Sequence, residues 1–557
     1  MNEIEEDVFE YTKTHLDIND LSDHELYKQH VHHQHSSFGL GGGPEYDGSE
    51  GDDEEKIPGI HGIPVIVEDM GDINDEKQSL QKEKSYSSCL PIENNKVGWD
   101  GPNDPENPRN FKNSVKVIQI ATISLISFFV PLGSSMFAPL ITQVLHEFNS
   151  DDEKLGAFCV SVFVLAFGFG PLVYGPCSEL YGRAISLHVG NVLFVVTTLC
   201  CGFVHSVGGL IGVRFVAGLC GSGVFAIGGG IISDLFEPHS RSRAVAAYTI
   251  GPLIAPAVGP IVGGFVGENH KLGFRWIFYI LAMGHAAVTV ISLFSLVETN
   301  PVILLERKTK RLRKETGNPN LTSVLSLDVS ARELFKRSFS RPFKVMYQSW
   351  LIDVLSLLNG IAYSLLFVMI TTFPIVFSEQ YGFKPSSVGL AYIGIGVGSM
   401  IPVIVIYLYG DRFYLYLCKR QKKQRAENRL LICVIFFFAL PTGLLWYGWS
   451  SEAKAHWIIP IIGTGYLVWG IVANWLSVQA YLIDAFGMYA ASATAANTFI
   501  RSVLASLIPL AGPPLYASIG IGWGNTVLAL IASINVPALI LIYKYGDKVR
   551  ERWPINL

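Results

Sequence analysis

An acid and a base lie four residues apart in the segment GPCSELYGR, residues 175–183, between two long apolar runs. Glycines near both ends allow the chain to reverse tightly. In such a loop the carboxylate of Glu179 can lie against the positive amino end of a helix, and the guanidinium of Arg183 can pair with acids or lipid phosphates. The plainer alternative is a short loop with one charge that sets topology.

A second candidate is Arg214, which begins a series of small residues spaced four apart: Gly218, Ser222, Ala226 and Gly230. Small residues at this period form a smooth stripe that lets another helix approach closely. Arg214 shares the stripe, so we expect it to point into a helix bundle. A charge buried in a membrane is costly and by default indicates a functional site. A structural arginine bonded to backbone carbonyls is the alternative.

A third candidate is the run YTIGPLIAPAVGPIVGGFVG, residues 248–267. One face carries small residues, and prolines repeat beside it at the same period, where each removes a backbone donor and bends the helix. The residues concerned are Gly251, Pro252, Ala255, Pro256, Gly259, Pro260, Gly263, Gly264 and Gly267. The pattern predicts a kinked, closely packed helix that can rock against a partner.

The composition indicates what kind of protein positions these residues. Of 557 residues, 50% are hydrophobic and 16% are charged, and the mean hydropathy is +0.35. Soluble domains contain about 25% charged residues, so a polytopic membrane protein fits better. The net charge of -5 gives no basic footprint for nucleic acid. The eight cysteines show no CxxC and no metal-ligand spacing, and we expect neither a metal nor a cofactor.

From Ser114 onward, apolar runs alternate with short polar breaks, and each run is long enough to cross a hydrocarbon core of about 30 Å. We predict an all-α membrane protein with twelve transmembrane helices in two six-helix bundles. The predicted spans are 114–137, 155–175, 185–206, 209–232, 244–267, 275–297, 351–377, 387–409, 429–449, 456–483, 489–512 and 522–544.

The polar segments complete the predicted organisation. Residues 1–110 are expected to form a disordered cytoplasmic tail, followed by a bundle over 111–297, a cytoplasmic central loop over 298–350, a second bundle over 351–545 and a short tail over 546–557. Lys and Arg are concentrated in the loops on the side of the tail, which predicts that both termini are cytoplasmic.

These motifs resemble those of a known family. The segment 175–183 is similar to the loop signature G-x-L-x-D-R-x-G-R of the major facilitator superfamily, with Cys177 and Ala184 as departures. The run at 255–264 is similar to the antiporter signature of its drug:proton antiporter branch, with Ala255 in place of the usual first glycine. The strings DPENPRN, SDLFEPHSRSRA and ETNPVILLERKTKRLRKETGN resemble fungal twelve-span members, and the resemblance runs from about Asp104 to the carboxyl end.

The resemblance implies a transporter whose central cavity opens alternately to each side. The expected activity is proton-coupled export of small hydrophobic, amphipathic or cationic compounds such as drugs, polyamines or a secondary metabolite. By resemblance, Arg214 is linked to proton transfer, and Glu179 with Arg183 to a cytoplasmic latch between the halves. The expected partners are the substrate, protons and the lipid bilayer, with a monomer in the plasma membrane; a vacuolar or other internal membrane is the alternative.

A proton-driven transporter also needs a group that changes protonation. Asp353, near the start of the seventh span, is the candidate we favour, and Asp484, His285 and Glu179 are alternatives. The candidate substrate-binding residues are aromatic, amide or basic side chains at suitable depths, although each can instead pack against a helix. They are Tyr363, Phe367, Trp475, Gln479, Asn497 and Arg501.

Other functions remain open at this stage. A narrow-specificity metabolite exporter or a solute importer would share the fold, and a non-transporting membrane receptor is a more distant possibility. An enzyme is the weakest alternative, since the spans contain no HExxH, GxSxG or paired-histidine motif.

Overall fold

The computed structural model describes residues 92–93, 95–150, 152–269, 272–326, 331–423 and 425–553. The chain divides into two units, Met1–Ile73 and Asn74–Leu557, and all described residues belong to the second unit. Most of the predicted tail, residues 1–91, and the last four residues, 554–557, therefore lie outside the described residues.

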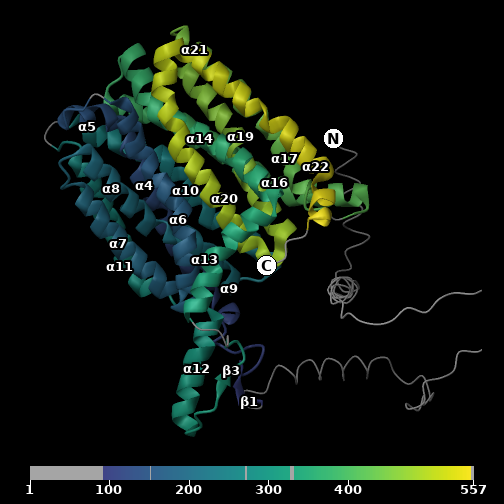
Figure 1. Cartoon of the computed structure of the whole chain (residues 1–557). Helices are drawn as coiled ribbons and strands as arrows, with labels where there is room; N and C mark the ends of the chain where they lie inside the picture. Colours follow the sequence, from purple (N-terminus) through teal and green to yellow (C-terminus); the bar gives the residue numbers. More distant parts are fainter. Residues whose placement is uncertain are drawn as a thin grey trace, which may run out of the picture. The chain divides into compact units, whose positions relative to one another are not determined.

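The first half of the described chain is a bundle of long helices connected by short turns (Figure 1). Asp152 caps α6 and Ser206 caps α8 by accepting hydrogen bonds from backbone N–H groups, as residues at helix amino ends commonly do. The elements are α4 (Asn113–Ser135), η2 (Ala138–Leu140), α5 (Ile141–Glu147), α6 (Glu153–Leu180), α7 (Arg183–Cys201), α8 (Val207–Gly221), α9 (Gly223–Leu235), α10 (Pro238–Glu268) and α11 (Arg275–Ser295).

The second half repeats this architecture. Its elements are α14 (Trp350–Ile375), the π-helical turn η3 (Val376–Gln380), α15 (Pro385–Ala391), α16 (Ile393–Gln421), α17 (Asn428–Phe437), α18 (Ala439–Glu452), α19 (Ile458–Phe486), η4 (Gly487–Tyr489), α20 (Ala490–Leu507), η5 (Ile508–Ala511), α21 (Gly512–Ser533) and α22 (Asn535–Arg552).

Eleven helical stretches of the described chain are long and apolar enough to cross a membrane, and the last of them, Ala490–Arg552, holds 63 residues. At about 1.5 Å per residue this stretch is roughly three times too long for one crossing of a core of about 30 Å. The backbone leaves the helical conformation at Gly520 (φ 80°, ψ 170°). The stretch therefore contains the last two of the twelve predicted spans, and the predicted all-α membrane fold is confirmed.

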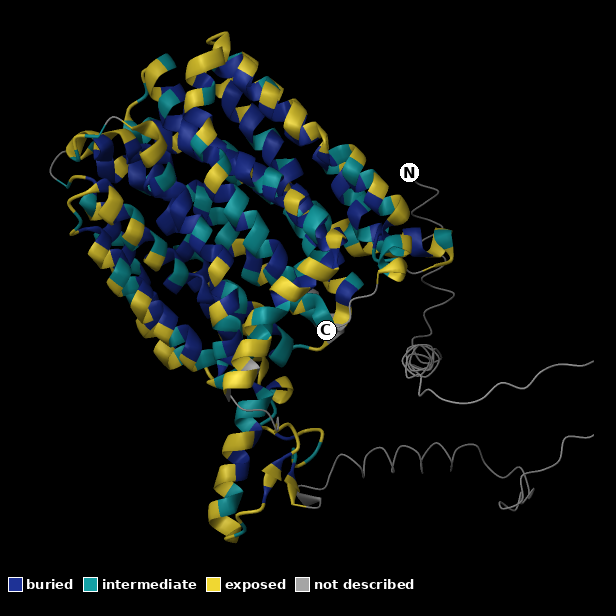
Figure 2. Cartoon of the chain, in the orientation of Figure 1, coloured by how far each residue is buried: buried dark blue, intermediate teal, exposed yellow. Residues whose placement is uncertain are grey.

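Each half buries its core between its own helices, and the halves meet along a small number of helix pairs. In the first half α10 packs on α4, and α6 on α8; in the second, α14 packs on α20, and α18 on α19 and α21. Between the halves, α6 packs on α20, and α10 on α15 and α16. Buried residues run along these contacts, while exposed residues gather on the outer faces of the helices (Figure 2). The exposed large residues include many Val, Leu, Ile and Phe side chains, as lipid-facing helix surfaces require.

The structure corrects two polar segments. The last part of the predicted disordered tail is folded: it forms the strands β1 (Ile92–Glu93) and β2 (Lys96–Val97) and the short helix η1 (Pro108–Asn110). The segment over 298–350, predicted as a loop, contains α12 (Pro301–Thr316), β3 (Thr322–Ser323) and α13 (Ala331–Gln348). β2 pairs antiparallel with β1 and parallel with β3.

A buried ion pair explains why this end of the tail is ordered. Lys308 of α12 donates to Asp104 at 2.9 Å and pairs with Asp100 at 2.7 Å. Asp104 also accepts hydrogen bonds from the backbone N–H groups of Asp100 and Glu106, each at 2.8 Å. Burial raises the pKa of Asp104, but the hydrogen bonds from Lys308 and these N–H groups outweigh it and leave the pKa below its ordinary value.

Candidate functional site

The loop between α6 and α7 is held by a carboxylate that the sequence analysis did not select. Glu298 accepts hydrogen bonds from the backbone N–H of Arg183 at 2.8 Å and from that of Ala184 at 3.3 Å. A carboxylate at this position satisfies unpaired donors at the amino end of α7 and complements the helix dipole. Gly182 has a φ of 101°, and a Cβ there would collide with Glu298. The glycine is therefore required both by backbone conformation and by space.

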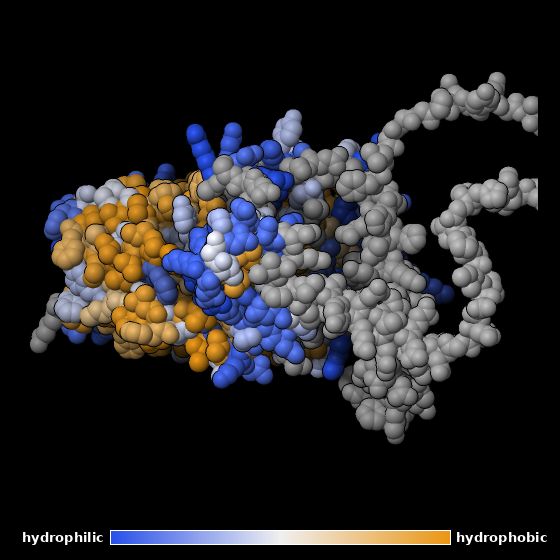
Figure 3. Space-filling view, turned by 90° about the horizontal axis from the view of Figure 1, so that it is seen from below, coloured by the Kyte–Doolittle hydropathy of each residue, from blue (hydrophilic) through white to orange (hydrophobic). Residues whose placement is uncertain are grey.

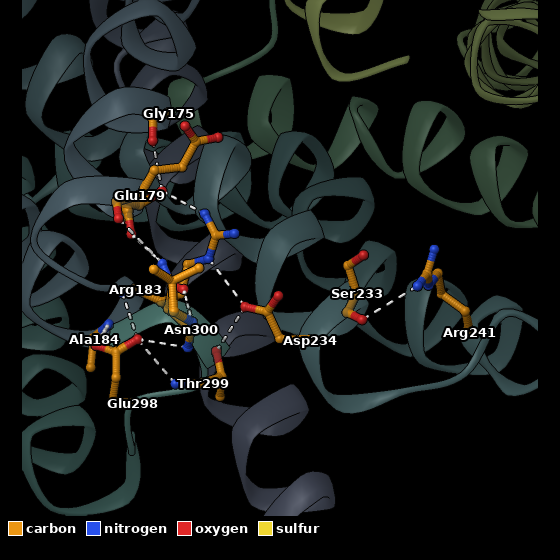
Figure 4. Close-up of polar contacts among 12 residues, drawn as sticks. Gly175, Glu179, Arg183, Ala184, Ser233, Asp234, Arg241, Glu298, Thr299 and Asn300 are labelled. Carbon is orange, nitrogen blue, oxygen red and sulfur yellow. Dashed lines mark hydrogen bonds and ion pairs between the residues drawn. The ribbon is translucent and has the colours of Figure 1, made fainter. Parts of the chain in front are cut away.

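The Arg183 side chain is bound by a second carboxylate that sequence reasoning missed (Figure 4). Its Nε lies 3.2 Å from Oδ2 of Asp234 at the end of α9, and its Nη1 donates to the Ser178 hydroxyl at 2.7 Å. Thr299 donates to the same Asp234 oxygen at 3.3 Å. The guanidinium lies over Gly230, where a Cβ would come within 2.8 Å of Cζ. The cluster thus joins α6, α7, α9 and the segment that follows α11.

The Glu179 carboxylate takes no part in this cluster. It is exposed and accepts a hydrogen bond from the Ser338 hydroxyl of α13 at 3.4 Å. The acid and base that are four residues apart in sequence are therefore not brought together, and Asp234 and Glu298 hold Arg183 instead. Both missed acids lie in strings that supported the family resemblance: Asp234 in SDLFEP and Glu298 in ETNP. No role was predicted for either residue.

Arg214 lies inside the first bundle, as its small-residue stripe predicted, and its side chain is 1% exposed. Nε donates to the carbonyl oxygen of Cys159 at 2.5 Å. The guanidinium carbon lies 4.7 Å from the ring centroid of Phe137, 5.5 Å from that of Phe163 and 5.9 Å from that of Phe278. Within the described chain Nη2 has no hydrogen-bond partner. The charge is compensated by ring faces and one carbonyl, a cation–π arrangement.

The proline-rich run forms α10, and its small residues allow two close helix contacts. On one face, a Cβ at Gly251 would collide with the Ser124 carbonyl of α4, and one at Gly263 with the Met136 carbonyl that follows α4. Another part of the helix meets the second half: a Cβ at Gly264 would collide with the Pro385 carbonyl.

The contact is reciprocal, because a Cβ at Gly389 would collide with the Pro260 carbonyl of α10. Pro252, Pro256 and Pro260 all lie inside this helix, and Ala255 is fully buried. At Gly259 a Cβ would collide with the Ser135 hydroxyl. α10 is therefore packed against both halves of the molecule.

The structure brings four of the proposed substrate-binding residues together in the second half. The guanidinium carbon of Arg501 lies 4.4 Å from the ring centroid of Tyr363 and 5.7 Å from that of Trp475. Phe367 packs edge-on against Tyr363 with the centroids 5.3 Å apart. Nε of Arg501 is buried without a hydrogen-bond partner in the described chain. α14, α19 and α20 thus present one arginine between two aromatic rings.

The two proposed amide residues lie in separate polar contacts. Asn497 accepts a hydrogen bond from Asn359 at 3.2 Å, and Asn359 accepts one from Asn474 at 3.4 Å. All three asparagines are buried, so they form a ladder that joins α20, α14 and α19. Gln479 donates to Thr494 at 3.3 Å. In this conformation the side-chain oxygen of Asn497 is engaged in fastening helices together.

The proton-carrier candidates are distributed over both halves. Asp353 lies in the first turn of α14, and its Oδ1 is buried without a partner in the described residues. His285 is fully buried against Phe194, with ring centroids 4.6 Å apart. Asp484 pairs with Arg429 at 2.9 Å, and Arg429 also contacts Asp411 of α16 at 2.5 Å. No described contact joins Asp353 to Arg214, Glu179 or Arg183.

No group of three or more His, Cys, Asp or Glu side chains in the described part of the chain could hold a metal ion. Two bundles that meet along glycine contacts, each with an arginine buried in its span region, define a membrane transporter.

The chain belongs to the Major Facilitator Superfamily, whose family model matches residues 123–509. It is 44% identical to the "MFS-type transporter penM" of Penicillium rubens, over 82% of this chain and 89% of that protein. It is 43% identical to the "Efflux pump radE" of Floropilus chiversii, over 82% of this chain and 85% of that protein. The chain is thus a multi-pass membrane transporter for a small molecule and not an enzyme.

Among solved structures, the chain is similar to the xylose transporter XylE from E. coli in a partially occluded inward-open conformation. The TM-score is 0.58 at 15% sequence identity, covering 78% of this chain and 98% of that chain. At this identity the similarity concerns the fold alone, and it agrees with the predicted arrangement of two six-helix bundles.

Proposed function

We propose that the protein is a proton-coupled exporter of small hydrophobic or amphipathic compounds that works by alternating access. We place it as a monomer in the plasma membrane, with both termini in the cytoplasm. In this orientation α12, α13 and the Arg183 cluster lie on the cytoplasmic side.

The observation that carries this proposal is the double packing of α10. Its small residues meet α4 within the first half, and Gly264 meets Pro385 of the second half. Glycine contacts of this kind let helix backbones approach without side chains between them. A bent helix in this place can hold one side of the transporter closed against water while the halves pivot. Such a seal suits an antiporter, which must not leak protons when its substrate site is empty.

Export as the direction is supported by the family relationship. A fungal relative with 43% identity carries the name efflux pump, and the sequence resembles the antiporter signature along α10.

The charge of the proposed substrate region refines the substrate class. Arg501 lies between Tyr363 and Trp475, and no ion pair joins it to a carboxylate in the described chain. Aromatic rings favour flat, apolar compounds, whereas an uncompensated guanidinium repels cations. Of the three predicted substrate classes, cationic compounds therefore fit this region least.

For proton coupling we propose Asp353 as the titrating carboxyl and Arg214 as the charge that responds to it. Within the described chain, Asp353 has an unpaired buried oxygen, and Arg214 has an unpaired buried nitrogen. Neither group meets, among the described residues, the neutralising partner that buried charges usually have, so the energy of each charge is expected to change when the halves move. Glu179, exposed and bonded to Ser338, is proposed only as a contact between α6 and α13.

The test is efflux from yeast cells that lack their own pumps, with and without a protonophore. Three fluorescent amphipathic dyes of similar size are compared, one neutral, one anionic and one cationic. We expect the neutral and anionic dyes to leave cells that express the protein, and the protonophore to abolish this loss. Surface expression with unchanged dye retention would count against broad export and favour a single-metabolite exporter or an importer. If only the cationic dye left the cells, the role given to Arg501 would be contradicted.

A further inference from the structure

We propose that α13 is an interfacial helix that binds the headgroups of anionic phospholipids in the leaflet on its side of the membrane. The geometry behind this proposal is a line of exposed aromatic residues beside a group of basic ones. The aromatic stripe is formed by Phe335, Phe339, Phe343 and Tyr347, and the basic face by the exposed Lys336, Arg337 and Lys344 with the half-buried Arg341.

The aromatic stripe is continuous and partly exposed. Its members are spaced four residues apart, and these residues are 36%, 41%, 38% and 94% exposed from Phe335 to Tyr347. The rings of Phe335 and Phe339 stack with centroids 6.3 Å apart, and Phe339 meets Phe343 at 5.9 Å. Exposed apolar patches of this kind mark contact with a partner or a membrane.

The other side of the helix fixes its place in the molecule. Pro342 and Val345 are buried, and Phe343 also touches Phe499 of α20 with the ring centroids 5.7 Å apart. α13 packs on both α6 and α20, which belong to opposite halves. Because the buried side of α13 packs on the bundles, the aromatic stripe is turned partly away from them.

The basic face supplies charge complementarity to an anionic surface. Lys336, Arg337 and Lys344 are exposed, and no ion pair with a carboxylate is found for them within the described chain. Helices that lie in a membrane interface combine an aromatic face with a Lys- and Arg-rich face. Basic clusters next to a membrane-spanning helix are attracted to acidic lipids.

The position along the chain places α13 at the level of the interface. α13 ends at Gln348, and the membrane-spanning helix α14 begins at Trp350. Trp350 packs against Trp553, with centroids 6.0 Å apart, and both are about half exposed. Tryptophans at both ends of spans mark the membrane interface. Seen from the side of α12, hydrophilic residues gather beside a broad apolar surface (Figure 3).

The neighbouring helix α12 provides a matched control. Arg307, Lys310 and Lys314 are also exposed and basic, but α12 contains no aromatic residue. Neutralising three charges on α12 therefore changes the net charge as much as neutralising three on α13, without touching a surface that also carries aromatic rings.

The experiment measures amide hydrogen exchange of the full-length protein in bilayer discs. One set of discs contains phosphatidylcholine alone, and the other contains phosphatidylcholine and phosphatidylserine in equal parts. We expect α13 amides to exchange roughly 100-fold more slowly in the discs with phosphatidylserine, because the attraction of three basic side chains to the anionic surface stabilises the bound helix. Inorganic phosphate added to the phosphatidylcholine discs is expected to give no such protection.

Two triple variants decide the outcome. Lys336→Gln/Arg337→Gln/Lys344→Gln is expected to remove the lipid-dependent difference, and Arg307→Gln/Lys310→Gln/Lys314→Gln to keep it. Unchanged exchange in α14 shows that each variant is folded. Equal exchange of the wild-type α13 in both lipids overturns the proposal, as does an equal loss in both triple variants, which would indicate diffuse attraction. Protection by inorganic phosphate alone would also overturn it.

Discussion

Cationic side chains in this protein are stabilised in two different ways, according to where they lie. Within the spans, Arg214 and Arg501 face aromatic rings, and neither has an ion pair with a carboxylate in the described residues. At the span ends and beyond them, Arg183 pairs with Asp234, and Lys308 of α12 with Asp100 and Asp104. The difference shows that these ion-paired charges are matched for holding structure, whereas each arginine within the spans retains a donor that is unused among the described residues.

The two arrangements also differ in how much their energy changes when a charge moves nearby. A buried arginine–carboxylate pair is neutral and gains little by moving. An arginine held by ring faces and one carbonyl keeps its full charge, and a proton or an acidic group arriving nearby changes its energy strongly. We therefore expect substitutions of the arginines in the spans to affect transport, and substitutions in the ion-paired groups at or beyond the span ends to affect stability.

The largest effect is expected for Arg214→Ala. Loss of the guanidinium removes the charge among Phe137, Phe163 and Phe278 and leaves the Cys159 carbonyl without its donor. We expect transport to fall to the background of untransformed cells while surface expression persists, as measured by dye efflux and surface labelling. Arg214→Lys keeps a charge but loses the planar ring contact, so partial transport is expected. Full transport in the alanine variant would remove Arg214 from the coupling mechanism.

The next effect is expected for Gly182→Ala, at the helix-end cluster. A side chain at φ 101° is strained and collides with Glu298, which should destabilise the protein by about 1–3 kcal/mol. Thermal unfolding of the purified protein measures the loss. Gly175→Ala is the matched control, because nothing lies within 4 Å of a Cβ there. Equal stability of the two variants would show that Glu298 does not hold the start of α7.

A smaller and selective effect is expected for Arg501→Gln. Loss of the contacts with Tyr363 and Trp475 and of the charge should raise the KM for an anionic dye by about tenfold to thirtyfold, the size of a partly buried cation–π contact. The neutral dye should change little, and Arg501→Lys should keep most of the preference for the anion. An equal loss for both dyes would point to a packing role instead.

The smallest effect on transport is expected from pH at the pair formed by Asp104 and Lys308. Because the pKa of Asp104 is depressed in the folded chain, its stabilising contribution is present above its unfolded value and is lost as pH falls through the folded value. Burial lowers the pKa of Lys308, but its hydrogen bonds with Asp100 and Asp104 outweigh this and raise it. The contribution of Lys308 is therefore present below its unfolded pKa and is lost as pH rises through the folded value.

Amide exchange in residues 95–110 should accordingly be slowest near neutral pH, after correction for intrinsic exchange, and increase first on acidification below about pH 4. Asp104→Asn should abolish this acid step and leave the exchange of α10 unchanged. An acid step that persists in Asp104→Asn would assign it to another carboxyl.

Sequence reasoning predicted the features that repeat locally. Hydropathy placed all the spans, the stripe from Gly218 to Gly230 placed Arg214 inside a bundle, and the glycine period of residues 251–263 placed α10 in close contacts. It predicted less well where a partner lies far along the chain. Asp234 is 51 residues from Arg183, Glu298 is 115 residues from it, and Asp104 is 204 residues from Lys308.

The amide residues illustrate the same limit. Asn497 and Gln479 lie at suitable depths for contact with a substrate, but only the packing of α14, α19 and α20 shows that Asn497 is bonded to Asn359. A polar side chain in a span has two uses, joining helices or meeting a ligand. Sequence alone does not distinguish them.

The pairing of β2 with β3 has a consequence for how the polypeptide can be divided. Lys96 lies opposite Thr322, and Val97 opposite Ser323, so the chain from β2 to β3 closes into a ring that contains every helix of the first half. A cut after Ser326 would leave both ends of this ring fastened together. Two separately translated pieces, 1–326 and 327–557, should therefore reassemble into one transporter, each already holding its own complete bundle.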